Sequence, residues 1–363
     1  MVDFVDSSQL NKWLFASTDE LRQCREKANA LARQKLSEES PSSSSTTPVH
    51  FACGYPLSSS DATIEAPWNN KKENPFLNAE EETTLVSFYV SKIPALIGPK
   101  ATVSRLRRES KVTATASLLL RRFFLSNSVM MFDPKVMMVA AAFLASKVED
   151  AMADARYLEE GTTALQSPVA LSEIIAAEVQ LLEGIHFDLL CFHPYKAVLA
   201  LTEDLRTYLK SDKGQSLVEH ERILSGQDLK PIYDKARIWL EDAMVSDLPL
   251  LYSPGQIGLA SMMVAQEELV QKDPKHPKID LPGYVRQRFD QEKVDEPLQS
   301  LQDLCEQLKA LRTGDHGCGN YFDDLHALKA IHKKLKKVRI WGDKKRKKKG
   351  DEEPSAKRVK TEG

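Results

Sequence analysis

The sequence predicts an all-α protein that contains the same helical bundle twice. Three observations predict it. From residue 79 onward, apolar residues recur every three or four positions, without the sustained alternation typical of strands. A helix that begins at Asp133-Pro134 is apolar on every side, as a helix at the centre of a bundle must be. The start of that helix recurs 120 residues later, at Ser253-Pro254.

The first predicted helix spans about residues 18–36, and a Ser-rich segment follows it. Residues 37–78 are rich in Ser, Pro and Asn and include the run SEESPSSSSTTP. Such a segment cannot bury enough apolar surface to order itself. We interpret it as a disordered insert between the N-terminal helix and the main body, and we favour an exposed linker over a functional loop.

Two amphipathic helices come next, one from about residue 79 and one from about residue 111. Each has a single apolar stripe at three- and four-residue spacing, which predicts that one face of each helix packs against the core. The stripes comprise Leu85, Phe88, Tyr89, Ile93 and Leu96 in the first helix and Val112, Ala116, Leu119, Leu120 and Phe123 in the second.

The central helix spans about residues 134–147. Asp133 can accept hydrogen bonds from the free N–H groups of the first turn, and Pro134 stands where a missing N–H costs nothing. The run MMVAAAFLA then goes round the whole helix, and its alanines allow close approach from several sides. The helix is too short and too closely flanked by charge to span a bilayer.

A helix at about residues 170–184 follows, and Gly184 fits its C-cap. Another helix starts near His193-Pro194, and the second copy of the bundle continues from there. The copies differ at one informative place, because Glu267 stands where the first copy has Lys147. The matching positions, counted from the two prolines, are Met137 with Ile257, Val139 with Leu259, Ala140 with Ala260, Leu144 with Val264 and Ala145 with Ala265.

Motifs and composition favour a regulator over an enzyme. The sequence has no Gly-rich phosphate loop, GxSxG or HExxH motif, and its histidines form no spaced set with carboxylates. The five cysteines make no CxxC pair, and Cys318 beside His316 offers two ligands where zinc needs four. We therefore expect no catalytic residue, no metal site and no cofactor. The absence of a long apolar run predicts no membrane span.

Charge is distributed unevenly along the chain. The net charge is −2, but residues 333–349 carry +10 and the fourteen residues after them carry −1, so the preceding body carries −11. Binding to nucleic-acid phosphates needs clustered Lys and Arg. We therefore expect no direct nucleic-acid binding by the core.

The segments LLLRRFFL, DPKVMMVAAAFLASKVED and EVQLLEGIHFDL resemble the first cyclin box, and LPLLYSPGQIGLASMM resembles the second. The segment NKWLFAS with the charged helix after it, and the long charged C-terminal helix, are similar to the flanking segments of the transcription-associated members of the cyclin family. The resemblance covers about residues 11–36 and 79–340. It implies two tandem bundles of five helices each, with flanking N- and C-terminal helices.

The resemblance also implies a division of the chain. The expected parts are an N-terminal segment and helix at 1–36, the insert at 37–78, the first cyclin box at 79–192, the second at 193–313, a C-terminal helix at 314–342 and a basic disordered tail at 343–363.

In the cyclin family, a lysine at the end of the third helix of the first box and a glutamate in the fourth form the centre of the kinase-binding surface. The matching residues here are Lys147 and Glu178. A cation at a helix C-terminus is favoured by the exposed carbonyl groups, which fits that role. The alternative is an ordinary surface ion pair that contributes roughly 0–1 kcal/mol to stability.

Trp13 and Phe15 precede the N-terminal helix. Aromatic side chains beside a helix often anchor an interface, so they are candidates for contact with a partner. They could equally fold back onto the bundle of their own chain.

The tail contains two basic clusters, which are typical of nuclear-import signals. A solvated, disordered end is compatible with that role, because an import signal must be accessible. The basic residues are Lys344, Lys345, Arg346, Lys347, Lys348 and Lys349 in the first cluster and Lys357 and Arg358 in the second.

Together these features imply a nuclear regulatory subunit that binds and activates a cyclin-dependent kinase. By resemblance, that kinase activates other cyclin-dependent kinases and phosphorylates the RNA polymerase II C-terminal domain, with a RING-type assembly factor and general transcription factor IIH as further partners. Another transcription-associated cyclin is the nearer alternative. A transcription factor IIB-like protein is the more distant one, since that function calls for an N-terminal zinc ribbon and a basic core.

Overall fold

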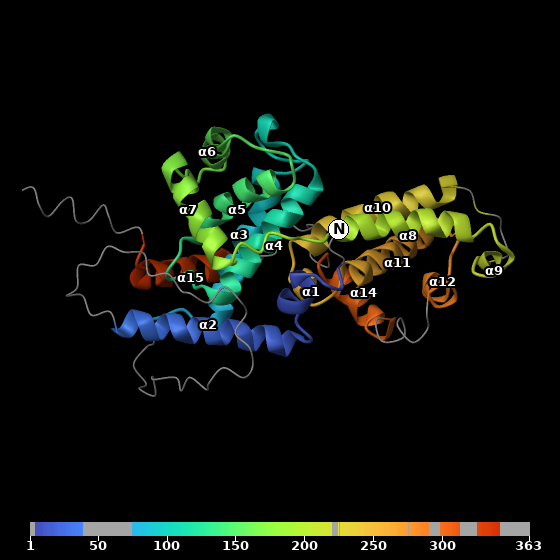
Figure 1. Cartoon of the computed structure of the whole chain (residues 1–363), viewed down its shortest axis with the longest axis horizontal. Coiled ribbons are helices and arrows are strands. Elements are labelled where there is room, and N and C mark those ends of the chain that lie inside the picture. The colour runs from blue at the N-terminus through green and yellow to red at the C-terminus, as the bar shows by residue number, and fades with distance from the viewer. Residues whose placement is uncertain are drawn as a thin grey trace, which may run out of the picture.

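The computed structural model describes residues 4–38, 75–219, 224, 226–274, 276–289, 298–312 and 325–341. Within these ranges the chain is all-α, and its only extended pairing is an isolated antiparallel bridge between Val218 and Ile279 (Figure 1). The predicted fold class is thereby confirmed. Most of the insert at 37–78 and the whole tail at 343–363 lie outside the described residues.

The first bundle consists of α3 (Ala79–Leu96), α4 (Ser110–Ser126), α5 (Pro134–Val148), α6 (Ala155–Ala164) and α7 (Leu171–Gly184), with a short 3-10 turn, η1 (Ser104–Leu106), before α4. Helix α5 packs against all four of the others. Pro134 and every residue from Met137 to Ser146 are buried, which confirms the central position that the all-round apolar surface of α5 predicted.

Local capping explains where α3 and α5 begin. Asn78 and Glu81 form a capping box, in which each side chain accepts a hydrogen bond from the backbone N–H of the other, at 2.7 and 2.8 Å. At α5, the Asp133 carboxylate accepts from the N–H of Lys135 at 2.9 Å, and Pro134 occupies the first helical position.

The second bundle repeats the first with α8 (Pro194–Tyr208), α10 (Gly226–Met244), α11 (Pro254–Lys272), α12 (Leu281–Arg288) and α14 (Leu301–Ala310). Its loops contain α9 (Asp212–Gln215) and η3 (Leu248–Leu250). Helix α11 takes the central place of α5 and packs against α8, α10 and α14. Ser253 caps it in a capping box with Gln256. Two tandem bundles, each with five helices among the described residues beside the short helices of its loops, are therefore present, as predicted. Figure 1 shows the two bundles side by side.

Helix α6 was not predicted from the sequence, and its presence makes α7 the fifth helix of the first bundle rather than the fourth. It is short and polar, and it contains Gly161 where a helix former would be usual. A Cβ at Gly161 would lie 2.7 Å from a methyl group of Leu106 and 3.1 Å from one of Leu96. The glycine is thus needed for close packing of α6 against η1 and α3, which no pattern within the segment reveals.

Both ends of the described chain pack on the first bundle. Helix α2 (Thr18–Glu38) lies against α3 and α4, and α15 (Leu325–Val338) lies against α3 (Figure 1). Leu328, Ile331 and Leu335 of α15 belong to the first bundle's core. The short helix α1 (Ser8–Trp13) lies between the two bundles.

A cluster of three charged side chains joins α2, α4 and the second bundle. Asp247, just before η3, accepts two hydrogen bonds from Arg25 at 2.8 and 2.9 Å and one from Arg121. Arg121 is buried in α4 and also donates to the carbonyl of Val245. Burial alone would raise the pKa of Asp247, but the two guanidinium groups outweigh it and hold that pKa far below its usual range.

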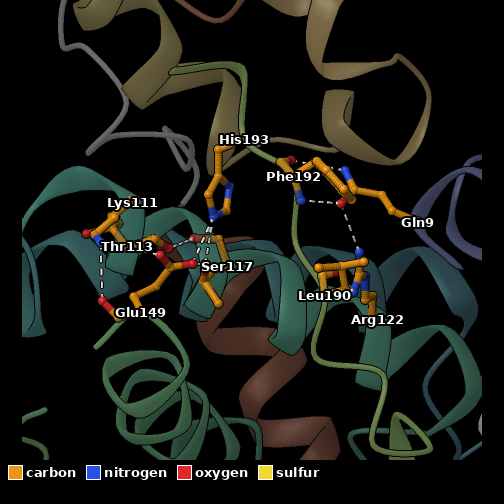
Figure 2. A network of polar contacts seen from close by, with 10 residues as sticks. Gln9, Lys111, Thr113, Ser117, Arg122, Glu149, Leu190, Phe192 and His193 are labelled. Atoms are coloured by element: carbon orange, nitrogen blue, oxygen red, sulfur yellow. Dashed lines mark hydrogen bonds and ion pairs between the residues drawn. The ribbon is translucent and has the colours of Figure 1, made fainter. Parts of the chain in front are cut away.

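The linker between the bundles is held by α1 and α4. Gln9 pairs with the backbone of Phe192 through both of its amide atoms, accepting from the N–H at 2.7 Å and donating to the carbonyl at 3.2 Å. Arg122, buried in α4, donates to the carbonyl of Leu190 at 3.0 Å. Figure 2 shows these contacts beside a second set that involves His193. Polar groups from α1 and α4 therefore hold the linker, and with it the start of the second bundle, in place.

Replacing Glu82 with glutamine should stabilise the protein in alkaline solution. The carboxyl group is buried, and that burial raises its pKa to about 7 despite hydrogen bonds from Ser128 and Asn29. Because the folded-state pKa lies above the unfolded one, at about 4.3, the native state binds the extra proton and loses stability as the pH rises through this interval. E82Q should be more stable than the parent by about 1–3 kcal/mol at pH 8.

Urea denaturation at pH 5.5 and pH 8.5 measures this effect. The matched control is E80Q, an exposed position on the same helix, which should leave the pH profile unchanged. If the free energy of unfolding of the parent and of E82Q changes with pH in the same way, ionisation of Glu82 costs the fold no stability and the prediction is wrong.

Candidate functional site

Lys147 and Glu178 form a bidentate ion pair on the surface of the first bundle. Lys147 lies in the last turn of α5 and Glu178 in the middle of α7, and these two helices pack against each other. The Lys147 Nζ donates to Oε1 and Oε2 of Glu178 at 2.8 and 2.9 Å. The structure thus brings together the two residues singled out from the sequence.

The pair is ordered but still accessible. The Lys147 side chain is 36% exposed and the Glu178 side chain 12%. One turn before Lys147, the ring of Phe143 lies 3.9 Å from Nζ, close enough for a cation–π contact. Since an ammonium group has three N–H donors, a donor remains available for a partner's carbonyl oxygen after the pairing with Glu178.

Exposed apolar side chains flank the pair. Ile175 and Val179 are 50% and 52% exposed and lie one turn apart on α7, on either side of Glu178 in the sequence. Met152, in the loop after α5, is also exposed. Exposed apolar side chains gathered beside a fixed ion pair mark this surface as a candidate protein interface. We call Ile175, Val179 and Met152 the apolar rim of the pair.

This rim was not predicted from the sequence, although a signal was present. In α7, Ile174, Ala177 and Leu181 form the buried face. Ile175 and Val179 then make a second apolar stripe, which burial in one core does not require.

The second bundle carries an ion pair between the same two helices of the repeat, with the charges exchanged. Glu267 of α11 stands at the position of Lys147 and accepts from the Nζ of Lys309, on α14, at 2.5 Å. Its central helix therefore presents an anion where that of the first bundle presents a cation, so the two faces cannot bind the same partner groups in the same way.

A partly buried network supports the end of α5. Two residues after Lys147, the Glu149 carboxylate accepts from Thr115 Oγ1 at 2.6 Å and lies 3.2 Å from His193 Nε2 and 3.7 Å from Lys111 Nζ (Figure 2). Burial would raise the pKa of Glu149, but the hydrogen bonds from His193 and Thr115 outweigh it and lower that pKa. The network ties the end of α5 to α4 and to the start of α8.

The loop after Glu149 is fixed as well. The guanidinium group of Arg108 donates to the carbonyls of Ala151 and Met152 at 2.7 and 2.8 Å. The contacts of Arg108 and Glu149 join residues 34 to 44 positions apart, so no local pattern in the chain reveals them. They keep the surroundings of Lys147 in one arrangement, which reduces the entropy that a partner's binding would cost.

Trp13 and Phe15 are buried in the chain itself, with exposed fractions of 1% and 6%. They pack with Leu21, Cys24, Leu125 and Leu250. The Trp13 indole N–H donates to Asp188 at 2.8 Å, and the Phe15 N–H donates to the carbonyl of Leu250 at 2.8 Å. Of the two alternatives left open by the sequence, the structure has the one in which both side chains fold back onto their own chain. They anchor α1 across the junction of the bundles.

The remaining candidate residues lie outside the described part of the chain. These are the basic tail residues from Lys344 to Arg358, and His316 with Cys318. Among the described residues, no three His, Cys, Asp or Glu side chains are grouped so that they could hold a metal ion. None of the helices seen in the structure is both long enough and apolar enough to cross a membrane.

Two tandem five-helix bundles, one of which presents a fixed ion pair within an apolar rim, define a helical docking module. Two known protein families match the chain. A family described as "Cyclin, N-terminal domain" matches residues 101–190, and one described as "Cyclin C-terminal domain" matches residues 193–313. The two matches cover more than half of the sequence, and the chain belongs to the cyclin family. The resemblance noted from the sequence is thereby confirmed.

Curated relatives carry cyclin H and CCL1 names. Cyclin CCL1 of Saccharomyces cerevisiae is 31% identical over 194 residues, which are 53% of this chain and 44% of that protein. The chain thus spans less than half the length of CCL1. Cyclin-H1-1 of Arabidopsis thaliana is 28% identical over 73% of this chain and 71% of its own length. The putative cyclin-H of Dictyostelium discoideum is 23% identical over 72% and 75%.

Two solved structures share the fold. A chain in the CAK complex of Chaetomium thermophilum, bound to ATP-gamma-S, aligns over the full length of both chains with a TM-score of 0.66 and 22% identity. A chain in the yeast TFIIK (Kin28/Ccl1/Tfb3) complex aligns over 84% of this chain and all of its own, with a TM-score of 0.55 and 23% identity. At these identities the likeness shows the fold alone.

Proposed function

We propose that this protein is the regulatory cyclin subunit of a cyclin-dependent kinase. The kinase is of the CDK-activating and transcription factor IIH type, which acts on other cyclin-dependent kinases and on the RNA polymerase II C-terminal domain. The observation that carries the proposal is the Lys147–Glu178 pair within its apolar rim, on one bundle of a cyclin fold. The cyclin H names of the relatives, and the CAK and TFIIK complexes that contain the structural neighbours, support it.

The pair would act on the mobile helix αC of the kinase. Lys147 would donate to free backbone carbonyls and Glu178 would accept from free backbone N–H groups of the segment next to that helix, and Ile175 and Val179 would cover its apolar side. Holding αC inward completes the Lys–Glu pair that aligns the phosphates of ATP in kinases. Activation is then a population shift, because the cyclin binds the active arrangement of the kinase better than the inactive one.

The role is regulatory, and we propose that the chain contributes no catalytic group of its own. The yeast complex that contains one structural neighbour has three named components, Kin28, Ccl1 and Tfb3, which supports a third subunit beside the cyclin and the kinase. We assign that place to a RING-type assembly factor, with general transcription factor IIH as the larger assembly.

An activity assay tests the proposal. A purified, inactive kinase of the CDK-activating type is titrated with the full chain, and phosphorylation of a polymerase C-terminal-domain peptide is measured. We expect activity to rise to saturation at a 1:1 ratio, since each chain has one such face among its described residues. A panel of other transcription-associated kinases in the same assay identifies the alternative partner. If every kinase stays inactive, the proposal is wrong.

We further propose that the basic tail directs import into the nucleus, where transcription-associated cyclins act. A fluorescent fusion that lacks residues 343–363 should lose its nuclear accumulation, whereas a fusion that lacks only residues 351–353, which are acidic, should keep it. Nuclear accumulation of the first fusion would assign import to another segment or to a partner.

A further inference from the structure

The second bundle has an open apolar groove of about 550 Å³ that is separate from the Lys147–Glu178 site. It lies between α8, the start of α11, α12 and the region of α14. None of its lining residues comes from the first bundle. The lining includes Ala200, Leu201, Asp204, Gly255 and Phe289.

The internal repeat shows which face of the first bundle corresponds to this groove. The buried positions of α3 and α8 have the same spacing, so α8 aligns with α3 at an offset of 112 residues. With this alignment, Ala200 and Leu201 of the groove take the places of Phe88 and Tyr89. The aligned buried residues are Val86, Val90, Ile93 and Ile97 with Val198, Thr202, Leu205 and Leu209.

In the first bundle, the corresponding face is covered by a helix. The ring of His332 on α15 contacts Phe88 and Tyr89 edge-on, with ring centroids 6.1 and 6.0 Å apart. Just beyond α15, the indole N–H of Trp341 donates to the carbonyl of Val129 at 2.9 Å, in the loop that precedes α5. A helix of the chain therefore occupies the corner between the first helix of that bundle and the start of its central helix.

The groove at the same corner of the second bundle has room for larger side chains. Ala200 has only a methyl group where Phe88 has a ring, and Leu201 replaces Tyr89. A Cβ built on Gly255 would meet no atom within 4 Å, so the groove is open at the start of α11. Phe289 at its edge is exposed.

The charged group in the groove wall, Asp204, already has its partners, and Ser253 and Gln256 of the wall are paired with each other in the capping box of α11. Asp204 accepts from the Tyr284 hydroxyl at 2.5 Å and from Arg288 Nε at 3.1 Å. What the groove offers a ligand is therefore apolar surface rather than charge, which favours an apolar helix face over a charged peptide.

We propose that this groove is the docking site for a helix of a protein partner, seated as α15 is on the first bundle, with an aromatic side chain at the position of His332. The chain's own α15 already occupies the first site, and we therefore assign this groove to a helix of a separate molecule. This surface goes beyond kinase activation, because it would let the chain hold a kinase and a second protein at once.

A helical peptide probe tests the proposal. The probe is residues 325–341 of this chain with His332→Trp, fluorescently labelled, and the unsubstituted peptide is its comparison. Fluorescence anisotropy with the full chain should show the His332→Trp peptide binding at least about tenfold more tightly than the unsubstituted one. Ala200→Trp in the protein, which fills the groove, should weaken that binding at least about tenfold, while Glu203→Trp, on an exposed side of the same helix, should change it less than about twofold.

Three results would overturn the proposal. Equal affinities for the Ala200→Trp and Glu203→Trp proteins would mean that the peptide binds elsewhere, for instance by displacing α15. Equal affinities of the protein for the two peptides would show that no aromatic side chain at this position anchors a helix in the groove. Dimerisation of the full chain that Ala200→Trp abolishes would make a second copy the occupant. Circular dichroism melting checks that Ala200→Trp folds, and Ala197→Phe is the substitute if it does not. Kinase activation by Ala200→Trp should remain intact, which separates this test from that of the proposed function.

Discussion

Charge reversal at Lys147 should weaken kinase binding strongly while the protein stays folded. K147E places two carboxylates where the parent has a bidentate pair, and it removes the donor proposed for the kinase backbone. Loss of one member of an interfacial hydrogen-bonded charge pair costs about 2–5 kcal/mol of binding, so the affinity should fall at least about thirtyfold. The partly exposed pair contributes only about 0–1 kcal/mol to folding. Isothermal titration calorimetry and thermal melting measure the two quantities.

The second bundle supplies the matched control. K309E breaks the corresponding pair with Glu267, between the same two helices of the repeat, and should leave kinase affinity unchanged with a similarly small loss of stability. The double variant K147E/E178K restores an ion pair of the opposite polarity and should still fail to bind the kinase. If K147E loses folding stability and affinity in equal measure, Lys147 is only an intramolecular salt-bridge partner.

Replacing Asp247 with asparagine should destabilise the fold strongly. Its carboxylate pairs with both Arg25 and the buried Arg121, and the variant removes this shared anion. Breaking a buried pair by removing one partner costs about 3–5 kcal/mol, and because the Asp247 side chain is 30% exposed the cost here should lie near the lower end of that range. Urea denaturation at pH 7 measures the change. The control is D234N, an exposed aspartate in the same bundle that pairs weakly with Lys230 at 3.5 Å, and it should cost about 0–1 kcal/mol.

The pH dependence gives a second measure of the Asp247 cluster. The pKa of Asp247 is depressed in the folded state, so its stabilisation is present above the unfolded value of about 3.9 and disappears as the pH falls below it. As the pH is lowered from about 4 to about 2, the free energy of unfolding of D247N should therefore fall less than that of the parent. If D247N and D234N lower the free energy of unfolding equally, the cluster contributes little to stability. The same follows if the stability of D247N and of the parent declines equally at acid pH.

The features that could be predicted from the sequence are local ones. The start of α5 and its duplicate at α11 depend on caps and prolines next to the helices, and the burial of α5 follows from its own apolar surface. Lys147 and Glu178 came from the family resemblance, and the structure shows that they meet. What could not be predicted depends on distant partners. Asp247 meets residues 126 and 222 positions away, and Glu149 meets His193 across the linker.

The N-terminal aromatics show a different limit. A short segment with Trp13 and Phe15 has the same composition whether it binds a partner or its own chain. The outcome depends on a hollow formed by Leu125 of the first bundle and Leu250 of the second, which exists only after both have folded. In the same way, the exposed stripe of Ile175 and Val179 is recognised only when the buried face of α7 is known.

The docking of α15 on the first bundle has a consequence for biosynthesis. Phe88 and Tyr89 emerge from the ribosome early, but the helix that shields them is translated after the entire second bundle. At about 5–20 residues per second, the roughly 150 residues between α7 and Trp341 take about 8–30 s to make. During that interval the nascent chain exposes an aromatic surface suited to chaperones. A prematurely terminated chain would keep it exposed and so mark itself for degradation.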